Sequence, residues 1–271
     1  MKRIAIHSVP RSGSSWLGEI FNSNELTIYK YQPLFSYAFK NRLTPNSTKI
    51  EIINFFNELK YFNDDFLDQK KEREKELSPI FIKNEKLRDT IVYKEVRYHH
   101  ILKNLLEKDN EIKIIGLVRN PLSVIYSWLM APKEFKKNQG WKEMDEWRFA
   151  SKKNLNKPEE FNGFEKWKEV AYLFEDLNQL YPNRFYLLRY DELINNSVKV
   201  VTDMFDFCGM NFLEQTDDFL TFSSNTDRSD EAYSVFRNEQ KDDKWKSNLN
   251  PLIINEIHKD LKGSALEKYL G

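Results

Sequence analysis

The sequence predicts an α/β fold with three layers, in which a central parallel sheet is flanked by helices on both faces. Short apolar runs recur along the 271 residues, and segments with helical periodicity lie between them. Strands that alternate with helices are typical of parallel sheets, because the crossover helices cover both faces. The chain shows no internal repeat, low-complexity tract or linker, so we expect one domain over residues 1–271.

The expected strands and helices follow from these patterns in chain order. The clearest buried strand is expected at residues 112–118. The other strands are expected at residues 4–9, 27–31, 90–96 and 185–188. A helix is expected to begin near Trp16, and others to lie within 46–77, 101–106, 120–128, 164–180 and 193–208. Asn120 is placed to cap the helix that Pro121 begins.

Composition narrows the functional classes. Lys+Arg and Asp+Glu number 42 each, so no excess positive charge favours nucleic acid. The chain has one cysteine, Cys208, which excludes a disulfide framework or a cysteine-rich metal site and is expected to be a small buried side chain. No apolar run has the length of a membrane span or a signal peptide, so we expect a cytoplasmic protein.

A polar loop with the sequence Pro-Arg-Ser-Gly-Ser-Ser-Trp follows the first expected strand, at residues 10–16. A helix that begins here would present free amide groups and partial positive charge to an anion. Gly13 lets the backbone approach a ligand closely, and Arg11 adds a cation. Further donors are the hydroxyl groups of Ser12, Ser14 and Ser15. A serine-capped helix after a turn has the same pattern, so the loop alone leaves both interpretations open. The loop lacks the Gly-Lys pair of a Walker A motif, which disfavours hydrolysis of a nucleoside triphosphate.

A second candidate anion site follows the strand at 112–118. Arg119 ends this strand, and Ser127 lies two turns along the next helix. Ligands bind open α/β sheets at the carboxyl edge, so the two side chains could hold a second phosphate. By itself the pattern also fits an ordinary strand end and helix cap.

The two strings at residues 10–22 and 117–127 together resemble motifs of sulfotransferases that use 3′-phosphoadenosine-5′-phosphosulfate (PAPS), and are closest to the carbohydrate 6-O-sulfotransferase branch. The resemblance implies a P-loop-like three-layer fold and metal-independent, in-line transfer that leaves PAP as product. It implies that Arg11 and residues 12–16, through Trp16, hold the phosphosulfate. It also implies that Arg119 and Ser127 hold the 3′-phosphate.

Three further strings agree with this resemblance. They are Tyr-Lys-Glu-Val-Arg at residues 93–97, Arg-Tyr-Asp-Glu-Leu at 189–193, and Lys-Trp-Lys at 244–246 with Leu249. The resemblance implies that Tyr190, in the second string, contacts the nucleotide. It also suggests that Arg237 corresponds to a loop arginine of the family that closes over the nucleotide.

The general base is where this chain departs from the pattern of the family. Many members of the family place a glutamate where this chain has Gln32, and an amide does not accept the proton. Another branch has a histidine on the strand that matches residues 93–98. We therefore predict Glu95 as the base, with His99 and His100 as alternatives, and a structural ion pair as the non-catalytic explanation for Glu95.

The other catalytic roles follow from charge. Arg11 would stabilise the negative charge that develops on the leaving oxygen, and Lys94 would orient a sulfate oxygen. No metal is expected. His7, at the end of the first strand, is expected to be a satisfied buried histidine.

The resemblance also implies the acceptor, a hydroxyl group that we expect to belong to a saccharide. Trp141, Trp147 and Trp167 either stack on sugar rings or pack at helix junctions. Two alternatives stay open, a phosphotransferase that uses ATP and a non-catalytic module that binds PAP or a glycan. Gln32 keeps the second of these open.

Overall fold

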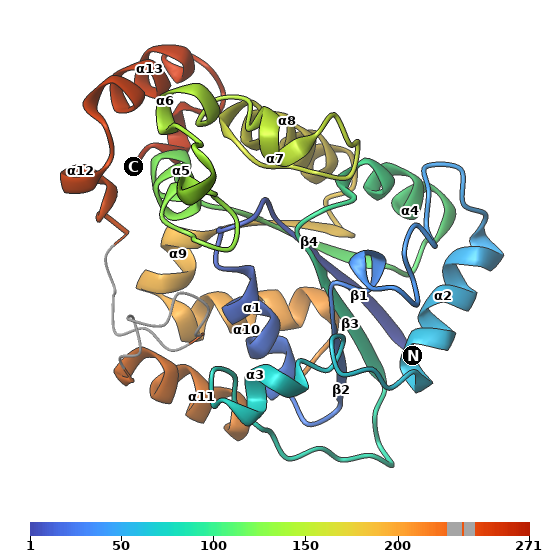
Figure 1. The fold of residues 1–271 in the computed structure, drawn as a ribbon. Coiled ribbons are helices and arrows are strands. Elements are labelled where there is room, and N and C mark those ends of the chain that lie inside the picture. The colour runs from blue at the N-terminus through green and yellow to red at the C-terminus, as the bar shows by residue number, and fades with distance from the viewer. Residues whose placement is uncertain (227–234, 236–241) are drawn as a thin grey trace.

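The computed structural model describes residues 1–226, 235 and 242–271. Five parallel strands form one sheet in the order β2-β3-β1-β4-β5, with helices on both sides (Figure 1). The strands are β1 (Lys2–His7), β2 (Thr27–Tyr31), β3 (Thr90–Glu95), β4 (Lys113–Val118) and β5 (Phe185–Arg189). Each predicted strand is present, and the predicted parallel sheet is confirmed.

The α-helices of the described residues connect and cover these strands. They are α1 (Ser14–Ser23), α2 (Lys49–Tyr61), α3 (Lys70–Glu74), α4 (Leu102–Lys108), α5 (Pro121–Leu129), α6 (Glu143–Glu146), α7 (Ser151–Asn154), α8 (Phe164–Leu180), α9 (Tyr190–Asn195), α10 (Ser197–Cys208), α11 (Glu214–Asn225), α12 (Trp245–Asn248) and α13 (Pro251–Leu261). Short 3-10 turns lie at η1 (Pro33–Phe35), η2 (His99–Ile101), η3 (Lys137–Gln139) and η4 (Glu267–Tyr269).

The sheet separates two hydrophobic cores, because successive side chains of a strand point to opposite faces. On β1, Ile4 and Ile6 face the core that α1, α10 and α11 complete. Ala5 faces the other core, which is filled from α2, α4, α5, α8 and α13. The three predicted layers are therefore present, and a strand residue belongs to one face or the other.

Local capping explains where some helices begin and end. The Asn120 side chain accepts a hydrogen bond from the Leu122 amide at 2.9 Å, and Pro121 is the first residue of α5, as predicted. The prediction of one helix over 193–208 is wrong, because the chain forms α9 and α10 with a break at Asn196, where φ is −138° and ψ is 46°.

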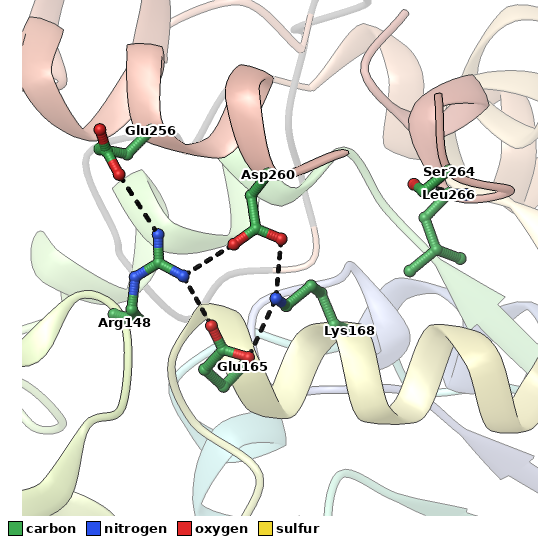
Figure 2. Close-up of polar contacts among 7 residues, drawn as sticks. All are labelled: Arg148, Glu165, Lys168, Glu256, Asp260, Ser264 and Leu266. Atoms are coloured by element: carbon green, nitrogen blue, oxygen red, sulfur yellow. Dashed lines mark hydrogen bonds and ion pairs between the residues drawn. The ribbon is translucent and has the colours of Figure 1, made fainter. Parts of the chain in front are cut away.

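A network of charged side chains joins α13 to α8 and to the segment after α6 (Figure 2). Arg148 pairs with Glu165 at 2.7 Å and with Asp260 at 2.8 Å, while Lys168 pairs with the same two carboxylates at 3.0 and 2.8 Å. Arg148 also reaches Glu256 at 3.7 Å. Single exposed pairs stabilise little, but several charges that share partners fix these segments more firmly.

Two further predictions concern the single cysteine and the absence of a membrane span. Cys208 is buried at the end of α10, and burial raises the pKa of its thiol to about 12, so it acts as the small apolar side chain that was predicted. Within the described part of the chain, every helix is too short or too polar to cross a bilayer.

Candidate active site

The strand order creates a crevice between the carboxyl ends of β1 and β4. These strands are neighbours, yet α1 after β1 packs on one face and α5 after β4 packs on the other. The two connections therefore diverge and leave space above the sheet edge, which is where open α/β sheets bind ligands. A cavity of about 350 Å³ lies there.

The loop after β1 supplies the first wall of this cavity. Gly13 precedes α1 with φ of +88°, and a Cβ at this position would lie 2.4 Å from Cε2 of Tyr190. Glycine is required here both by its backbone conformation and by this contact. The Leu17 amide donates the first backbone hydrogen bond of α1, to the Gly13 carbonyl. The amides that precede Leu17 in α1 are therefore available to an anion.

The loop residues reach the cavity to different degrees. The walls include Pro10, Arg11, Gly13, Ser14, Ser15 and Trp16. Ser12 is buried beneath them, and its hydroxyl has no hydrogen-bond partner among the described residues. Trp16 donates from its indole nitrogen to the Ser223 hydroxyl of α11 at 3.0 Å, which fixes one side of the cavity.

The second predicted anion site lies against the first. Arg11 donates to the Ser127 hydroxyl at 3.1 Å, and Arg119 donates to the carbonyl of Arg11 at 2.7 Å. The guanidinium of Arg119 also lies 4.7 Å from the centre of the Tyr190 ring. All four side chains line the same cavity, although the motifs that contain Arg11 and Arg119 are about a hundred residues apart in sequence.

Asp242 forms an ion pair with Arg119. The two side chains make two hydrogen bonds, at 2.9 and 2.5 Å, and are 13% and 15% exposed. The Asp242 carbonyl accepts hydrogen bonds from Ser123 and from the Trp245 indole, each at 3.1 Å. A carboxylate thus occupies part of the hydrogen-bonding edge that Arg119 would offer a phosphate. The Lys-Trp-Lys string that contains Trp245 lies beside this anchor.

Lys94, which was predicted to orient a sulfate oxygen, lies in the cavity wall. It lines the cavity from the end of β3, is 2% exposed, and its ammonium lies 4.3 Å from the centre of the Tyr31 ring. Burial lowers the pKa of Lys94 to about 7, while the carboxylates of Glu95 and Glu134 act in the opposite direction. An anion in the cavity would favour the charged form.

Glu95 lies on the other face of β3 from Lys94. It is fully buried and absent from the cavity walls, to which the flanking Lys94 and Val96 both contribute. One carboxylate oxygen accepts a hydrogen bond from the Leu34 amide at 2.7 Å, and the other has no described partner. Burial raises the pKa of Glu95 to about 8. This geometry does not support Glu95 as the base, because side chains alternate along a strand and Glu95 faces the core.

The alternative histidines also lie away from the cavity. His7 and His99 are buried with their Nδ1 atoms 3.1 Å apart, and His7 Nε2 lies 3.2 Å from the Tyr93 hydroxyl. Burial lowers the pKa of His7 to about 3. His100 is exposed on η2 and is likewise absent from the cavity walls.

Gln32 lies where the sequence suggested, at the cavity beside the end of β3. Its backbone has φ of +44°, and its backbone N–H donates to the Lys94 carbonyl at 2.8 Å. Its side-chain oxygen accepts from Arg97 at 2.9 Å, and Arg97 in turn pairs with Glu160 at 3.0 Å. A glutamate in place of Gln32 would meet the same guanidinium.

The remaining predictions for the site divide by location. Trp147 and Trp167 are buried in the core, and the Trp167 indole donates to the Arg119 carbonyl at 3.0 Å, so packing is the correct interpretation for these two. Trp141 packs edge-on against Phe135. Arg237 lies outside the described residues.

Several cavity residues had no motif that could identify them. They are Phe66, Gln69, Glu72, Lys75, Leu77, Ser78, Lys133, Glu134, Ile194, Ser197, Ser223, Ser224 and Val235. Most come from 66–78 and 133–134, two segments of ordinary polar composition. Only the tertiary fold brings them to the carboxyl edge of the sheet.

The fold and this cavity define an α/β protein in which Arg11 and Arg119 lie side by side at the carboxyl edge of a parallel sheet. A comparison with protein families gives the class: the sulfotransferase domain model matches residues 1–269, and the chain belongs to this family. It is a sulfotransferase. A comparison with curated protein sequences finds no match.

Solved structures show the same fold at low sequence identity. Mouse sulfotransferase SULT7A1, complexed with PAP, is 13% identical with a TM-score of 0.55, over 99% of this chain and 88% of that chain. The sulfotransferase domain of the Synechococcus PCC 7002 olefin synthase is 18% identical with a TM-score of 0.53, over 96% and 94%. Retinol dehydratase in a complex with retinol and PAP is 13% identical with a TM-score of 0.56, over 97% and 82%. The predicted P-loop-like fold is therefore confirmed.

Proposed function

We propose that this sulfotransferase moves the sulfuryl group of PAPS to a hydroxyl group of a carbohydrate, in one domain over residues 1–271. The observation that carries the proposal is the convergence of two anion motifs, in which Arg11 contacts Ser127 and Arg119 contacts the Arg11 backbone. PAPS differs from ATP-like ligands in having a 3′-phosphate as well as a 5′-anion. Two adjacent cationic sites suit such a ligand.

Each anionic group of the nucleotide has candidate partners among the residues of the cavity. The amides at the start of α1, with Arg11 and the Ser14 and Ser15 hydroxyls, would bind the phosphosulfate. Arg119 and Ser127 would bind the 3′-phosphate, and Tyr190 would line the space between the two anions. Ser12 lies under the loop and would support its backbone.

The transfer requires stabilisation at the leaving oxygen and orientation of the sulfuryl group. Arg11 is placed at the cavity beside the α1 amides, where charge would develop as the bond to the leaving phosphate breaks. Lys94 would contact a sulfuryl oxygen from the β3 side, and the anion would keep its ammonium protonated.

The saccharide acceptor rests on the motif resemblance and on the wall beyond Lys94. This wall combines an aromatic ring, Phe66, with the hydrogen-bonding groups of Gln32, Gln69 and Arg97. An aromatic ring can pack against the apolar face of a sugar, and amide and guanidinium groups can form hydrogen bonds with its hydroxyl groups. The cytoplasmic location stays a prediction.

A ligand-binding and transfer assay tests the function. PAP should raise the melting temperature markedly and adenosine 5′-phosphosulfate much less, because only PAP carries the 3′-phosphate. Labelled PAPS should then sulfate members of a saccharide array in EDTA. Equal thermal shifts from both nucleotides would contradict the assigned 3′-phosphate site. Transfer that requires Mg²⁺ and ATP would favour the phosphotransferase, and PAP binding without any transfer would favour the non-catalytic module that Gln32 suggests.

A further inference from the structure

The proposed transfer leaves one proton without an assigned acceptor. A hydroxyl that attacks sulfur must lose its proton, and the amide of Gln32 does not take it. Glu95 and the His7–His99 pair lie outside the cavity walls. Among the described residues that form those walls, the carboxylates are Glu72, on α3, and Glu134, on the segment after α5.

The backbone at Glu134 is held by the core. The amides of Glu134 and Phe135 both donate to the Ala131 carbonyl, at 2.9 and 2.8 Å. The Phe135 ring is 2% exposed and packs edge-on against Trp128 and Trp141, at 5.2 and 5.7 Å between ring centres. The neighbouring residue is thereby anchored, and Glu134 is positioned by a packed turn of the chain rather than by a freely exposed loop.

Glu134 lines the same cavity as the cation Lys94. The charge of the Glu134 carboxylate raises the pKa of both Lys94 and Tyr31. The Glu134 side chain is half-buried, and no described residue donates a hydrogen bond to it. A carboxylate of this kind, beside a cation that would hold the sulfuryl group, has lone pairs available to an incoming hydroxyl.

We propose that Glu134 is the general base of the transfer, an inference that rests on the proposed function. The acceptor oxygen forms a bond to sulfur while the bond from sulfur to the bridging phosphate oxygen breaks. The electron pair of the broken bond leaves with PAP, whose charge Arg11 stabilises. The hydroxyl proton passes to the Glu134 carboxylate and is later released to water. Glu134 would take the role of the glutamate that many members of the family have where this chain has Gln32.

The test compares Glu134→Gln with Glu72→Gln, a matched change at the other cavity carboxylate. Labelled PAPS is offered with a panel of hydroxyl compounds: an N-acetylglucosamine disaccharide, 2-naphthol and octanol. The compound that the wild-type protein sulfates fastest is used for both variants. We expect Glu134→Gln to lower kcat by about 100-fold or more, the usual scale for losing a general base. Glu72→Gln should stay within about threefold of wild type, and both variants should keep the thermal shift from PAP.

A rescue experiment separates a catalytic from a structural role. Glu134→Ala removes the carboxylate and leaves space, so added formate should restore part of the turnover, whereas the amide of Glu134→Gln fills that space and should block rescue. Near-normal kcat in Glu134→Gln, or loss of PAP binding in parallel with activity, would overturn the assignment of Glu134 as the base and leave the proposed function standing. A wild-type protein that binds PAP but sulfates no compound would overturn the proposed function, and this assignment with it.

Discussion

Replacement of Glu95 by glutamine should change how stability depends on pH while leaving transfer almost intact. The Glu95 carboxyl is fully buried, and burial raises its pKa from the usual 4.5 to about 8. A carboxyl with a raised pKa favours the folded state when protonated. Its contribution is therefore complete below pH 4.5 and is lost as the pH rises toward 8.

The size of the effect follows from the width of this window. Each pH unit inside it lowers the free energy of unfolding by about 1.4 kcal/mol, so Glu95 removes roughly 2–3 kcal/mol between pH 5 and pH 7. Glutamine is neutral at both values and should abolish that loss.

Urea unfolding of the ligand-free protein at pH 5 and pH 7 measures this prediction. Burial lowers the pKa of His7 and His99, and their contribution has the opposite sign, but it cancels when the two proteins are compared. Equal pH dependence in wild type and Glu95→Gln would show that the carboxyl is ionised in the folded state. A folded variant that lost about 100-fold in turnover would restore Glu95 as the base, as the sequence suggested.

Three further predictions concern the anion anchors. Arg119→Ala should weaken PAP binding, measured by calorimetry, by roughly 2–4 kcal/mol and adenosine 5′-phosphosulfate binding much less, because it removes a charged contact in a partly buried site; equal losses would contradict its assignment to the 3′-phosphate. Asp242→Asn should tighten PAP binding by about 5- to 20-fold, since the carboxylate that pairs with Arg119 competes with the phosphate; weaker binding would mean instead that Asp242 orients Arg119 in the complex. Arg11→Ala should lower kcat more than it weakens PAP binding, as expected for a contact that is strongest in the transition state, and a variant with normal kcat and a raised KM for PAPS would argue against that role.

Much of this structure could be predicted from short-range patterns. Apolar runs identified all five strands, and the Asn120-Pro121 pair identified the start of α5. The break at Asn196 escaped, because the apolar period of residues 193–208 continues across it. That Arg11 and Arg119 lie close together was also predictable, since each follows a strand directly, and strand ends of a parallel sheet meet at one edge.

The proposed general base could not be predicted in the same way. Lys94 and Glu95 were both assigned to the chemistry, yet adjacent residues of a strand face opposite sides of a sheet. Alternation alone would have shown that only one of them reaches the cavity. Glu134 lies in a turn without a recognisable motif, and its position depends on the packing of Phe135 between Trp128 and Trp141. Such a contact is a property of the folded core.

The strand order also fixes the direction of a ligand bound as proposed. Arg119 directly follows β4 and Lys94 is the penultimate residue of β3, and these two strands lie on opposite sides of β1, whose loop carries Arg11. A nucleotide with its 3′-phosphate at Arg119 and its phosphosulfate at the α1 amides must therefore point the sulfuryl group toward β3. The acceptor then approaches over β3 and β2, where Gln32 and Arg97 lie. Substitutions at Gln32 or Arg97 should consequently alter the choice of acceptor while PAP binding is retained, because these side chains lie beyond the sulfuryl group and away from both anchors.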